Sequence, residues 1–397
     1  MENKRVPELR FAGFAGDWEE RKLGELVEIK SGWTPSDFVE TQKCNGEIYI
    51  KVDDLNYSTR ELLDSKMKVA IHAKYHTIKK GSTIFPKRGA AIMTNKVRIL
   101  GTDGYMDTNM MALEPRNING EFLYTLIDRT GLFKIADTST IPQINNKHVE
   151  PYKILLPNLY EQKNIGNFFK QLDDTIALHQ QELTTLKQTK QGFLQKMFPK
   201  EGESVPEVRF PGFTGEWEQR KADEIFYSVS DKNHSNLPVL SATQEKGMVY
   251  RDETGLDINY DVKSTKNYKR VLPGQFVIHL RSFQGGFAFS NIEGITSPAY
   301  TVLDFKNKEM YYSLFWRCVL ASDTFIKRLE AVTYGIRDGK SISFSDFSTL
   351  KFRVPSHNEQ LKIGNFFKQL DDTIALHQCE LDTLKETKKA FLQKMFV

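Results

Sequence analysis

The stretch IGNFFKQLDDTIALHQ occupies residues 165–180 and occurs again, unchanged, at residues 363–378. It belongs to a longer repeat, because residues 164–198 return at 362–396 with 29 of 35 positions identical. A second motif also returns: VPELRFAGFAGDWEERKLGEL at 6–26 matches VPEVRFPGFTGEWEQRKADEI at 205–225. The two repeat offsets, 198 and 199 residues, agree within one, so the chain consists of two copies of one unit.

Two middle segments of nearly equal length, residues 27–163 and 226–361, lie between the repeated motifs and share little sequence. A constant frame that carries two different inserts of one size indicates two versions of one module with different specificities. A solenoid is the alternative interpretation, but two long repeats with divergent middles match it poorly.

The repeated closing segments predict long helices over residues 161–198 and 359–396. Neither segment contains proline, and their apolar residues alternate in steps of four and three, which is typical of a coiled-coil seam. The seam residues are Ile165, Phe169, Leu172, Ile176, Leu183 and Leu186, with Ile363, Phe367, Leu370, Ile374, Leu381 and Leu384 as their counterparts. His179 and His377 interrupt the seams near their midpoints. A structural role in fixing the register is the stronger interpretation, since two histidines are too few ligands for a metal site.

The connection between the copies predicts how the two helices pair. Only about six residues, 199–204, separate the first helix from the second module, so the second helix must run back along the first. The result is an antiparallel coiled coil with one module at each end. At ~1.5 Å per residue each helix is roughly 57 Å long, which equals about 17 base pairs at ~3.4 Å each.

Both middle segments alternate strand-like stretches with short helical ones. The expected strands are 48–55, 82–87 and 97–100 in the first module and 238–243, 275–282 and 300–305 in the second, with helices over 120–134 and 310–329. The predicted fold class is α+β: two modules of mixed sheet and short helices, joined by two long helices in an antiparallel coiled coil with pseudo-twofold symmetry. The expected boundaries are 1–158 and 200–356 for the modules, and 159–199 and 357–397 for the helices.

Basic residues are concentrated within the modules. The net charge of +4 is only mildly basic, yet residues 65–102 contain nine Lys and Arg and no acid. Residues 262–292 contain five basic residues, again without an acid. Such runs are typical of an electrostatic footprint for a phosphate backbone, and a solvated basic face without a partner is the alternative.

A shared pattern inside the basic runs indicates candidate contacts. An arginine follows a glycine by seven residues in both modules, as Gly81 to Arg88 and Gly274 to Arg281, with a predicted strand between them. Arginine at the end of a strand can bind phosphate or guanine. With neighbouring polar clusters, the candidate DNA-binding residues are Trp33, Thr34, Lys51, Lys87, Arg88, Asn95, Lys96, Arg98, Gln143, Asn145, Thr243, Gln244, Lys269, Arg270, Arg281, Ser282, Gln284, Arg337 and Lys340. A role in turns or ordinary surface remains open for each of them.

Enzyme motifs are incomplete wherever they begin. The run GIRDGKS at 335–341 is one residue short of a phosphate-binding loop, and SPAY at 297–300 lacks the second proline of an adenine methyltransferase motif. His72 and His76 lack a glutamate after the first histidine and a third ligand. The three cysteines are odd in number and far apart, which favours the cytoplasm, and no apolar run of about 18 residues predicts a membrane span.

The repeated motifs, with SGWTPS at 31–36 and TIPQINN at 140–146, resemble the specificity subunit of type I restriction–modification enzymes over essentially the whole chain. The resemblance implies two target-recognition domains that each read half of a bipartite, asymmetric double-stranded DNA target, with a coiled coil that sets the spacer. It also implies two methyltransferase subunits that bind S-adenosylmethionine, and restriction subunits that translocate DNA with ATP and Mg. This chain would hold no cofactor and catalyse no reaction. A lone methyltransferase or nuclease, and a two-headed protein scaffold, remain as alternatives.

Overall fold

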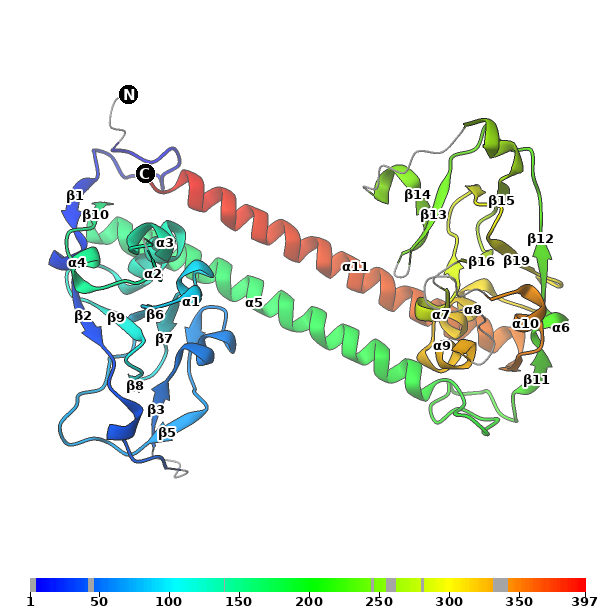
Figure 1. The fold of residues 1–397 in the computed structure, drawn as a ribbon, viewed down its shortest axis with the longest axis horizontal. Helices are drawn as coiled ribbons and strands as arrows, with labels where there is room; N and C mark the ends of the chain where they lie inside the picture. The colour runs from blue at the N-terminus through cyan, green and yellow to red at the C-terminus, as the bar shows by residue number, and fades with distance from the viewer. Residues whose placement is uncertain are drawn as a thin grey trace. The chain divides into compact units, whose positions relative to one another are not determined.

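A computed structural model describes residues 5–41, 46–138, 140–243, 246–254, 262–279, 282–330 and 342–397. Packing divides the chain into two compact units, which we call unit 1 (residues up to 182, with 377–397) and unit 2 (residues 183–376). Each unit contains one module and parts of both long helices (Figure 1). Among the described residues no helix is long and apolar enough to cross a membrane.

Unit 1 is built around a five-stranded sheet in the order β2-β9-β6-β7-β4. These strands are β2 (Val27–Ser31), β9 (Met110–Pro115), β6 (Thr83–Pro86), β7 (Arg98–Leu100) and β4 (Glu61–Leu62). Two further sheets pair β5 (Met67–Val69), β3 (Glu47–Ile50) and β8 (Gly104–Met106), and β1 (Glu19–Lys22) with β10 (Lys153–Leu156). Short helices are α1 (Ala90–Met93), α2 (Gly120–Thr130), α3 (Leu132–Ile135) and α4 (Asn146–Val149), with 3-10 turns η1 (Leu23–Glu25), η2 (Pro35–Asp37) and η3 (Val52–Asn56).

Unit 2 repeats the centre of this sheet in the order β12-β19-β16-β17. These strands are β12 (Phe226–Val229), β19 (Thr301–Phe305), β16 (Phe276–Ile278) and β17 (Ala288–Phe289). The remaining pairs are β13 (Leu240–Thr243) with β14 (Gly247–Tyr250), β15 (Lys269–Val271) with β18 (Gly294–Thr296), and β11 (Glu218–Lys221) with β20 (Lys351–Val354). The helices are α6 (Ala222–Ile225), α7 (Ser282–Gly285), α8 (Ser313–Leu320), α9 (Asp323–Glu330) and α10 (Phe344–Ser348), with η4 (Arg251–Thr254) and η5 (Val262–Asn267).

The long helices α5 (Leu159–Lys196) and α11 (His357–Lys394) have 38 residues each and equivalent boundaries, 198 residues apart. They pair antiparallel: in unit 1 the rings of Phe168 and Phe391 lie 5.1 Å apart, and in unit 2 those of Phe193 and Phe366 lie 5.1 Å apart. The predicted seam residues are buried or half-buried, and the fully buried ones are Ile165, Phe169, Leu183, Ile363, Phe367 and Leu381. The predicted α+β modules and antiparallel coiled coil are confirmed.

The repeated opening motif anchors each module on the start of its long helix. Arg10 donates two hydrogen bonds, of 2.6 and 2.7 Å, to the fully buried carboxylate of Glu161 on α5. Arg209 binds Glu359 on α11 with the same two distances. The Trp18 ring is buried, and its centroid lies 6.2 Å from that of the Phe122 ring on α2. An aromatic contact therefore anchors the opening motif of unit 1 in addition to the ion pair.

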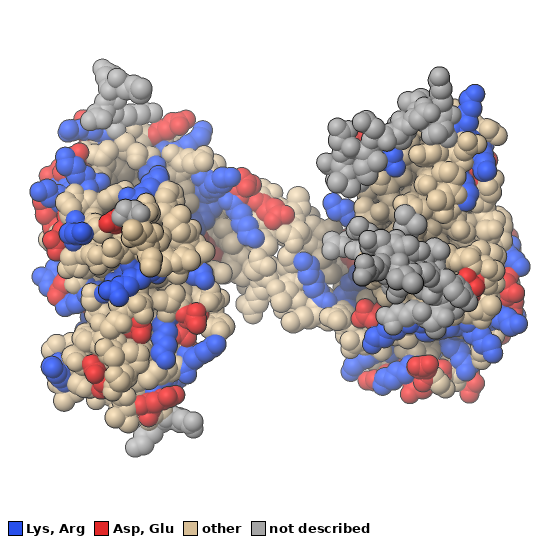
Figure 2. Space-filling view, in the orientation of Figure 1, with Lys and Arg blue, Asp and Glu red and all other residues tan. Residues whose placement is uncertain are grey.

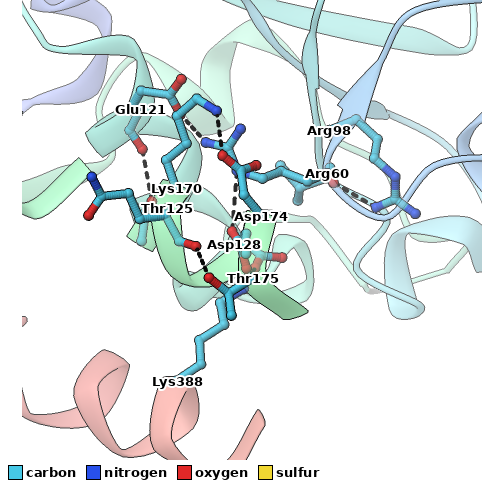
Figure 3. A network of polar contacts seen from close by, with 12 residues as sticks. Arg60, Arg98, Glu121, Thr125, Asp128, Lys170, Asp174, Thr175 and Lys388 are labelled. Carbon is cyan, nitrogen blue, oxygen red and sulfur yellow. Dashed lines mark hydrogen bonds and ion pairs between the residues drawn. The ribbon is translucent and has the colours of Figure 1, made fainter. Parts of the chain in front are cut away.

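A charged network joins the module of unit 1 to both long helices (Figure 3). Arg60 pairs with Glu121 on α2 and lies 3.2 Å from Asp173 on α5. Lys388 on α11 lies 2.7 Å from Asp173 and 4.0 Å from Asp128 on α2.

Unit 2 repeats the central pair of this network with the helices exchanged. Lys190 on α5 contacts Asp371 on α11 at 2.5 Å, and Arg317 on α8 approaches Asp371 at 3.4 Å. Lys190 and Asp371 are the repeat counterparts of Lys388 and Asp173. The pseudo-twofold symmetry therefore extends to the ion pairs.

Several predicted elements were wrong in their extent. The helix expected over 120–134 is interrupted at Gly131, which has φ 84°, and the one expected over 310–329 begins at Ser313 and is interrupted between α8 and α9. The strand expected over 48–55 ends at Ile50, because the side chain of Asp54 accepts a hydrogen bond from the Lys51 backbone and closes the turn η3. The strand expected over 275–282 ends at Ile278, and Ser282 begins α7.

Candidate nucleic-acid interface

In unit 1, strands β2 and β6 both end beside the first residues of β9, so all three meet at one end of the sheet, which we call its edge. Ser31 is paired with Met111 and Pro86 with Met110, so the segments that follow β2 and β6 leave from one edge. The residues at this edge are 31–34, 87–88, 107–109 and 143–145, and we call them the strand-end cluster. It contains six of the sequence-predicted residues: Trp33, Thr34, Lys87, Arg88, Gln143 and Asn145.

Hydrogen bonds hold the strand-end cluster together across long sequence separations. The Lys87 ammonium donates to the Ser31 hydroxyl at 3.1 Å, and the Lys87 backbone N–H donates to the Asn109 carbonyl at 2.8 Å. The Ile144 N–H donates to the Lys87 carbonyl at 2.9 Å, and Arg88 forms a β-bridge with Gln143. Four segments from different parts of the module thus form one local surface.

Trp33 is positioned in this cluster by aromatic contacts and by a glycine. Its ring stacks on Tyr75 at 5.3 Å, with an interplanar angle of 27°, and meets the edge of Tyr105 at 5.9 Å. A side chain at Gly32 would place its Cβ 2.0 Å from the Asp107 carbonyl oxygen, so only glycine fits there. The glycine of the SGW motif is therefore required by the close approach of this loop to the segment before β9.

The electrostatics of the strand-end cluster favour an anion. Burial lowers the pKa of Lys87, and the neighbouring Arg88 lowers it further, while Asp107 acts in the opposite direction. The Arg88 side chain is exposed. Two adjacent cations, one of them partly desolvated, are stabilised when a phosphate binds beside them.

Four candidates of the first module lie outside the strand-end cluster. The Arg98 guanidinium donates to the carbonyls of Ser58 and Leu55 at 2.7 Å, and burial lowers its pKa. Asn95 has φ 49°; its side-chain amide donates to the Asp128 carbonyl and accepts from the Leu132 N–H. The Lys96 ammonium donates to the Asn56 side chain, and Lys51 is exposed just before η3. Because Asn95 and Arg98 are engaged in holding the backbone, we do not retain them as DNA contacts.

Unit 2 presents the equivalent edge with different residues. Strands β12 and β16 end where β19 begins, with Val229 paired to Val302 and Ile278 to Thr301. The Lys269 ammonium donates to the Tyr300 carbonyl at 2.6 Å, and the His279 and Tyr300 rings lie 6.1 Å apart. Burial, and then the charge of Lys232, lowers the pKa of Lys269.

The other candidates of the second module have different surroundings. Arg270 pairs with Glu293 and Asp231, which raise its pKa and leave its charge compensated. The Thr243 hydroxyl closes the turn between β13 and β14. Ser282 is fully buried, and its hydroxyl accepts a hydrogen bond from the His279 backbone N–H. Gln284 is exposed on α7. Gln244, Arg281, Arg337 and Lys340 lie outside the described residues.

The acid-free runs of the sequence do not become acid-free surfaces. Lys79 pairs with Asp103 at 2.8 Å and Lys68 with Asp64 at 3.4 Å, both acids coming from just outside the run. On the face of unit 1 shown in Figure 2, basic and acidic side chains are intermixed. Any phosphate site is therefore local, as at Lys87 and Arg88.

Reasoning from the sequence missed Tyr75 and Asn109 in unit 1 and Tyr300 in unit 2. Tyr75 stacks on Trp33 although 42 residues separate them, so no local pattern identifies it. Tyr300 belongs to the SPAY run, which the sequence presented only as an incomplete enzyme motif.

Comparisons with known proteins agree with the two-module architecture of the chain. A family model described as "Type I restriction modification DNA specificity domain" matches residues 15–188 and again residues 215–386. The type I restriction enzyme MjaVIII specificity subunit of Methanocaldococcus jannaschii is 24% identical over 415 residues, which cover 99% of this chain and 93% of the relative. The putative MjaX specificity subunit of the same organism is 23% identical over 405 residues, which cover 95% and 92%. The S subunit of a type I restriction–modification system from M. genitalium shares the fold, with a TM-score of 0.64 at 16% identity over 99% of both chains.

Proposed function

Because the chain belongs to the family of type I restriction–modification DNA specificity domains, we propose that its two modules read the two halves of a bipartite, asymmetric DNA target. Specificity subunits are the non-catalytic recognition subunits of these systems. They act in complexes with methyltransferase and restriction subunits, and this chain positions both kinds of subunit on its target.

One observation carries the proposal: the same edge of the same sheet carries different side chains in the two modules. In unit 1 Trp33, Lys87 and Arg88 lie there. In unit 2 Tyr300 lies there, the Lys269 ammonium reaches it from β15, and His279 is buried beside it. A shared frame positions the modules alike on DNA, while different side chains at the frame's edge select different bases. The two half-sites therefore differ in sequence.

The long helices supply the spacer in this proposal. Each has 38 residues, so its length is ~57 Å at ~1.5 Å per residue, or about 17 base pairs. In this proposal residues 1–158 and 200–356 are the two recognition modules. Residues 159–199 and 357–397 are the two spacer helices.

The test is sequencing of the methylated adenines in cells that express matching methyltransferase subunits with or without this chain. The expected result is a new bipartite, asymmetric motif that requires the chain. Exchange of residues 27–156 for those of another module should change one half of this motif only. A change in both halves, or no motif despite a formed complex, would contradict the proposal.

The strand-end cluster is tested by Lys87→Ala and Arg88→Ala in the same complex. Each variant should lower DNA affinity and reduce the dependence of the binding constant on salt by about one phosphate contact. Arg116→Ala is the matched control, since Arg116 is exposed and pairs with Glu28 at the opposite end of β2 and β9. Equal losses in Arg88→Ala and Arg116→Ala would exclude the strand-end cluster as the contact surface.

A further inference from the structure

We propose that unit 1 holds a divalent transition-metal ion of the zinc type between α5 and α11, bound by His179, Glu182, His377 and Glu380. The sequence presents these residues as two copies of one motif, HQQE at 179–182 and HQCE at 377–380. Residues three apart share one face of a helix, so each helix presents an imidazole and a carboxylate side by side. Antiparallel pairing brings the two motifs together.

The distances between the ligand atoms fit one ion. His179 Nδ1 lies 3.8 Å from Glu380 Oε2, and His377 Nδ1 lies 3.8 Å from Glu182 Oε2 and 3.7 Å from Glu380 Oε2. One ligand atom each from His179, Glu182 and His377 lie within 4.8 Å of one another. A tetrahedral zinc ion with bonds of ~2.1 Å requires ligand separations of about 3.4 Å, so small side-chain shifts complete the site.

The histidine nitrogens that face this point have no hydrogen-bond partner among the described residues. Nδ1 of His179 and Nδ1 of His377 are both buried and unsatisfied, and 3.7–3.8 Å is too long for a hydrogen bond to the glutamates. Buried polar atoms without partners are rare in folded proteins, because they lose hydration without compensation. A metal ion supplies the missing partner to both nitrogens at once.

The four side chains are exposed enough for an ion to enter, and the two members of each equivalent pair are exposed to nearly the same extent. His179 and His377 are 24% and 25% exposed, and Glu182 and Glu380 are 46% and 45% exposed. Two imidazoles and two carboxylates form a hard-to-borderline donor set that suits zinc and similar ions. The bound ion would link the middles of α5 and α11 and fix their register.

The experiment uses the untagged full chain, Zn²⁺ measured by calorimetry and Co²⁺ measured by its visible absorption. One Zn²⁺ per chain, a tetrahedral Co²⁺ spectrum and a higher Tm with zinc are expected. The double variant His179→Gln/His377→Gln should weaken Zn²⁺ binding at least about 100-fold and Glu182→Gln at least about 10-fold, with the helix signal in circular dichroism retained. His357→Gln is the control, because its Nδ1 is also buried and unpaired, yet it lies outside the cluster on the same helix.

Affinity for Zn²⁺ should also fall in acid, since protons compete with the metal for the imidazole nitrogens. The absence of stoichiometric Zn²⁺ binding by the unmutated chain would overturn the proposal. Equal binding by the double histidine variant would do the same.

Discussion

Substitution of Asp173 by asparagine tests whether the charged network of unit 1 stabilises the packing of the module on the helices. The carboxylate lies between Arg60 and Lys388, whose side chains are 8% and 20% exposed, while Asp173 itself is 11% exposed. Removal of one partner from a buried ion pair costs about 3–5 kcal/mol, because the remaining charge is left in a medium of low polarity. Here Arg60 keeps Glu121 and Lys388 is partly exposed to solvent, so we expect a loss of about 2 kcal/mol in the free energy of unfolding.

Differential scanning calorimetry measures the effect, and the adjacent residue provides the control. A loss of about 2 kcal/mol corresponds to a fall of roughly 4–8 °C in the Tm of a unit of this size. Asp174 is 58% exposed and, among the residues that the structure describes, pairs with Lys170 alone, so Asp174→Asn should cost less than about 0.5 kcal/mol. Asp371→Asn, in the more exposed network of unit 2, should fall between these two values. Equal Tm values for Asp173→Asn and Asp174→Asn would refute the reasoning.

Three further predictions concern a half-buried acid, the coiled coil and a thiol. Burial raises the pKa of Asp128, so its ionisation destabilises the fold. This penalty is absent below the unfolded pKa of about 3.9, grows as the pH rises from there to the folded pKa, and is complete above it. Asp128→Asn should therefore raise the free energy of unfolding at pH 7 but not at about pH 3.5, and urea unfolding that shows equal effects at both values would contradict this. The double variant Leu172→Asp/Leu370→Asp places two charges in the seam, which should lower the free energy of unfolding by about 2–4 kcal/mol. It should also weaken binding to the joined target more than binding to single half-sites. Normal binding by this variant would show that the helices do not set the spacing. Burial raises the pKa of the Cys318 thiol to about 12. Iodoacetamide at about pH 8 should therefore leave Cys318 unmodified while it alkylates the exposed Cys379, as measured by peptide mass spectrometry. Comparable labelling of both cysteines would contradict this.

The local and repetitive features of this protein could be predicted from its sequence. The helices over 161–198 and 359–396 were placed within two residues at each end, because a seam sustained over several heptads without proline is a strong periodic signal. The antiparallel pairing followed from a short connection. The glycine, strand and arginine pattern was likewise local, and Gly81 and Gly274 do precede β6 and β16 with φ 88° and 90°.

The tertiary structure decided which polar residues meet. Lys87 and Arg88 are joined to Ser31 and Gln143 by contacts across 55 residues or more, and no short-range pattern distinguishes them from Arg98, whose guanidinium binds backbone carbonyls. The strand-end cluster arises because antiparallel pairing brings the ends of β2 and β6 to the start of β9.

The same division applies at the middle of the long helices. Periodicity identified His179 and His377 as interruptions of an apolar seam, and two histidines alone are too few for a metal site. Glu182 and Glu380 lie outside the apolar seam pattern, and although the His-x-x-Glu spacing occurs twice, spacing within one helix does not show that the two copies face each other. Only the packing of one helix against the other, which places each glutamate near the opposite histidine, brings the four side chains together, because proximity across two helices depends on their register and not on spacing within either one.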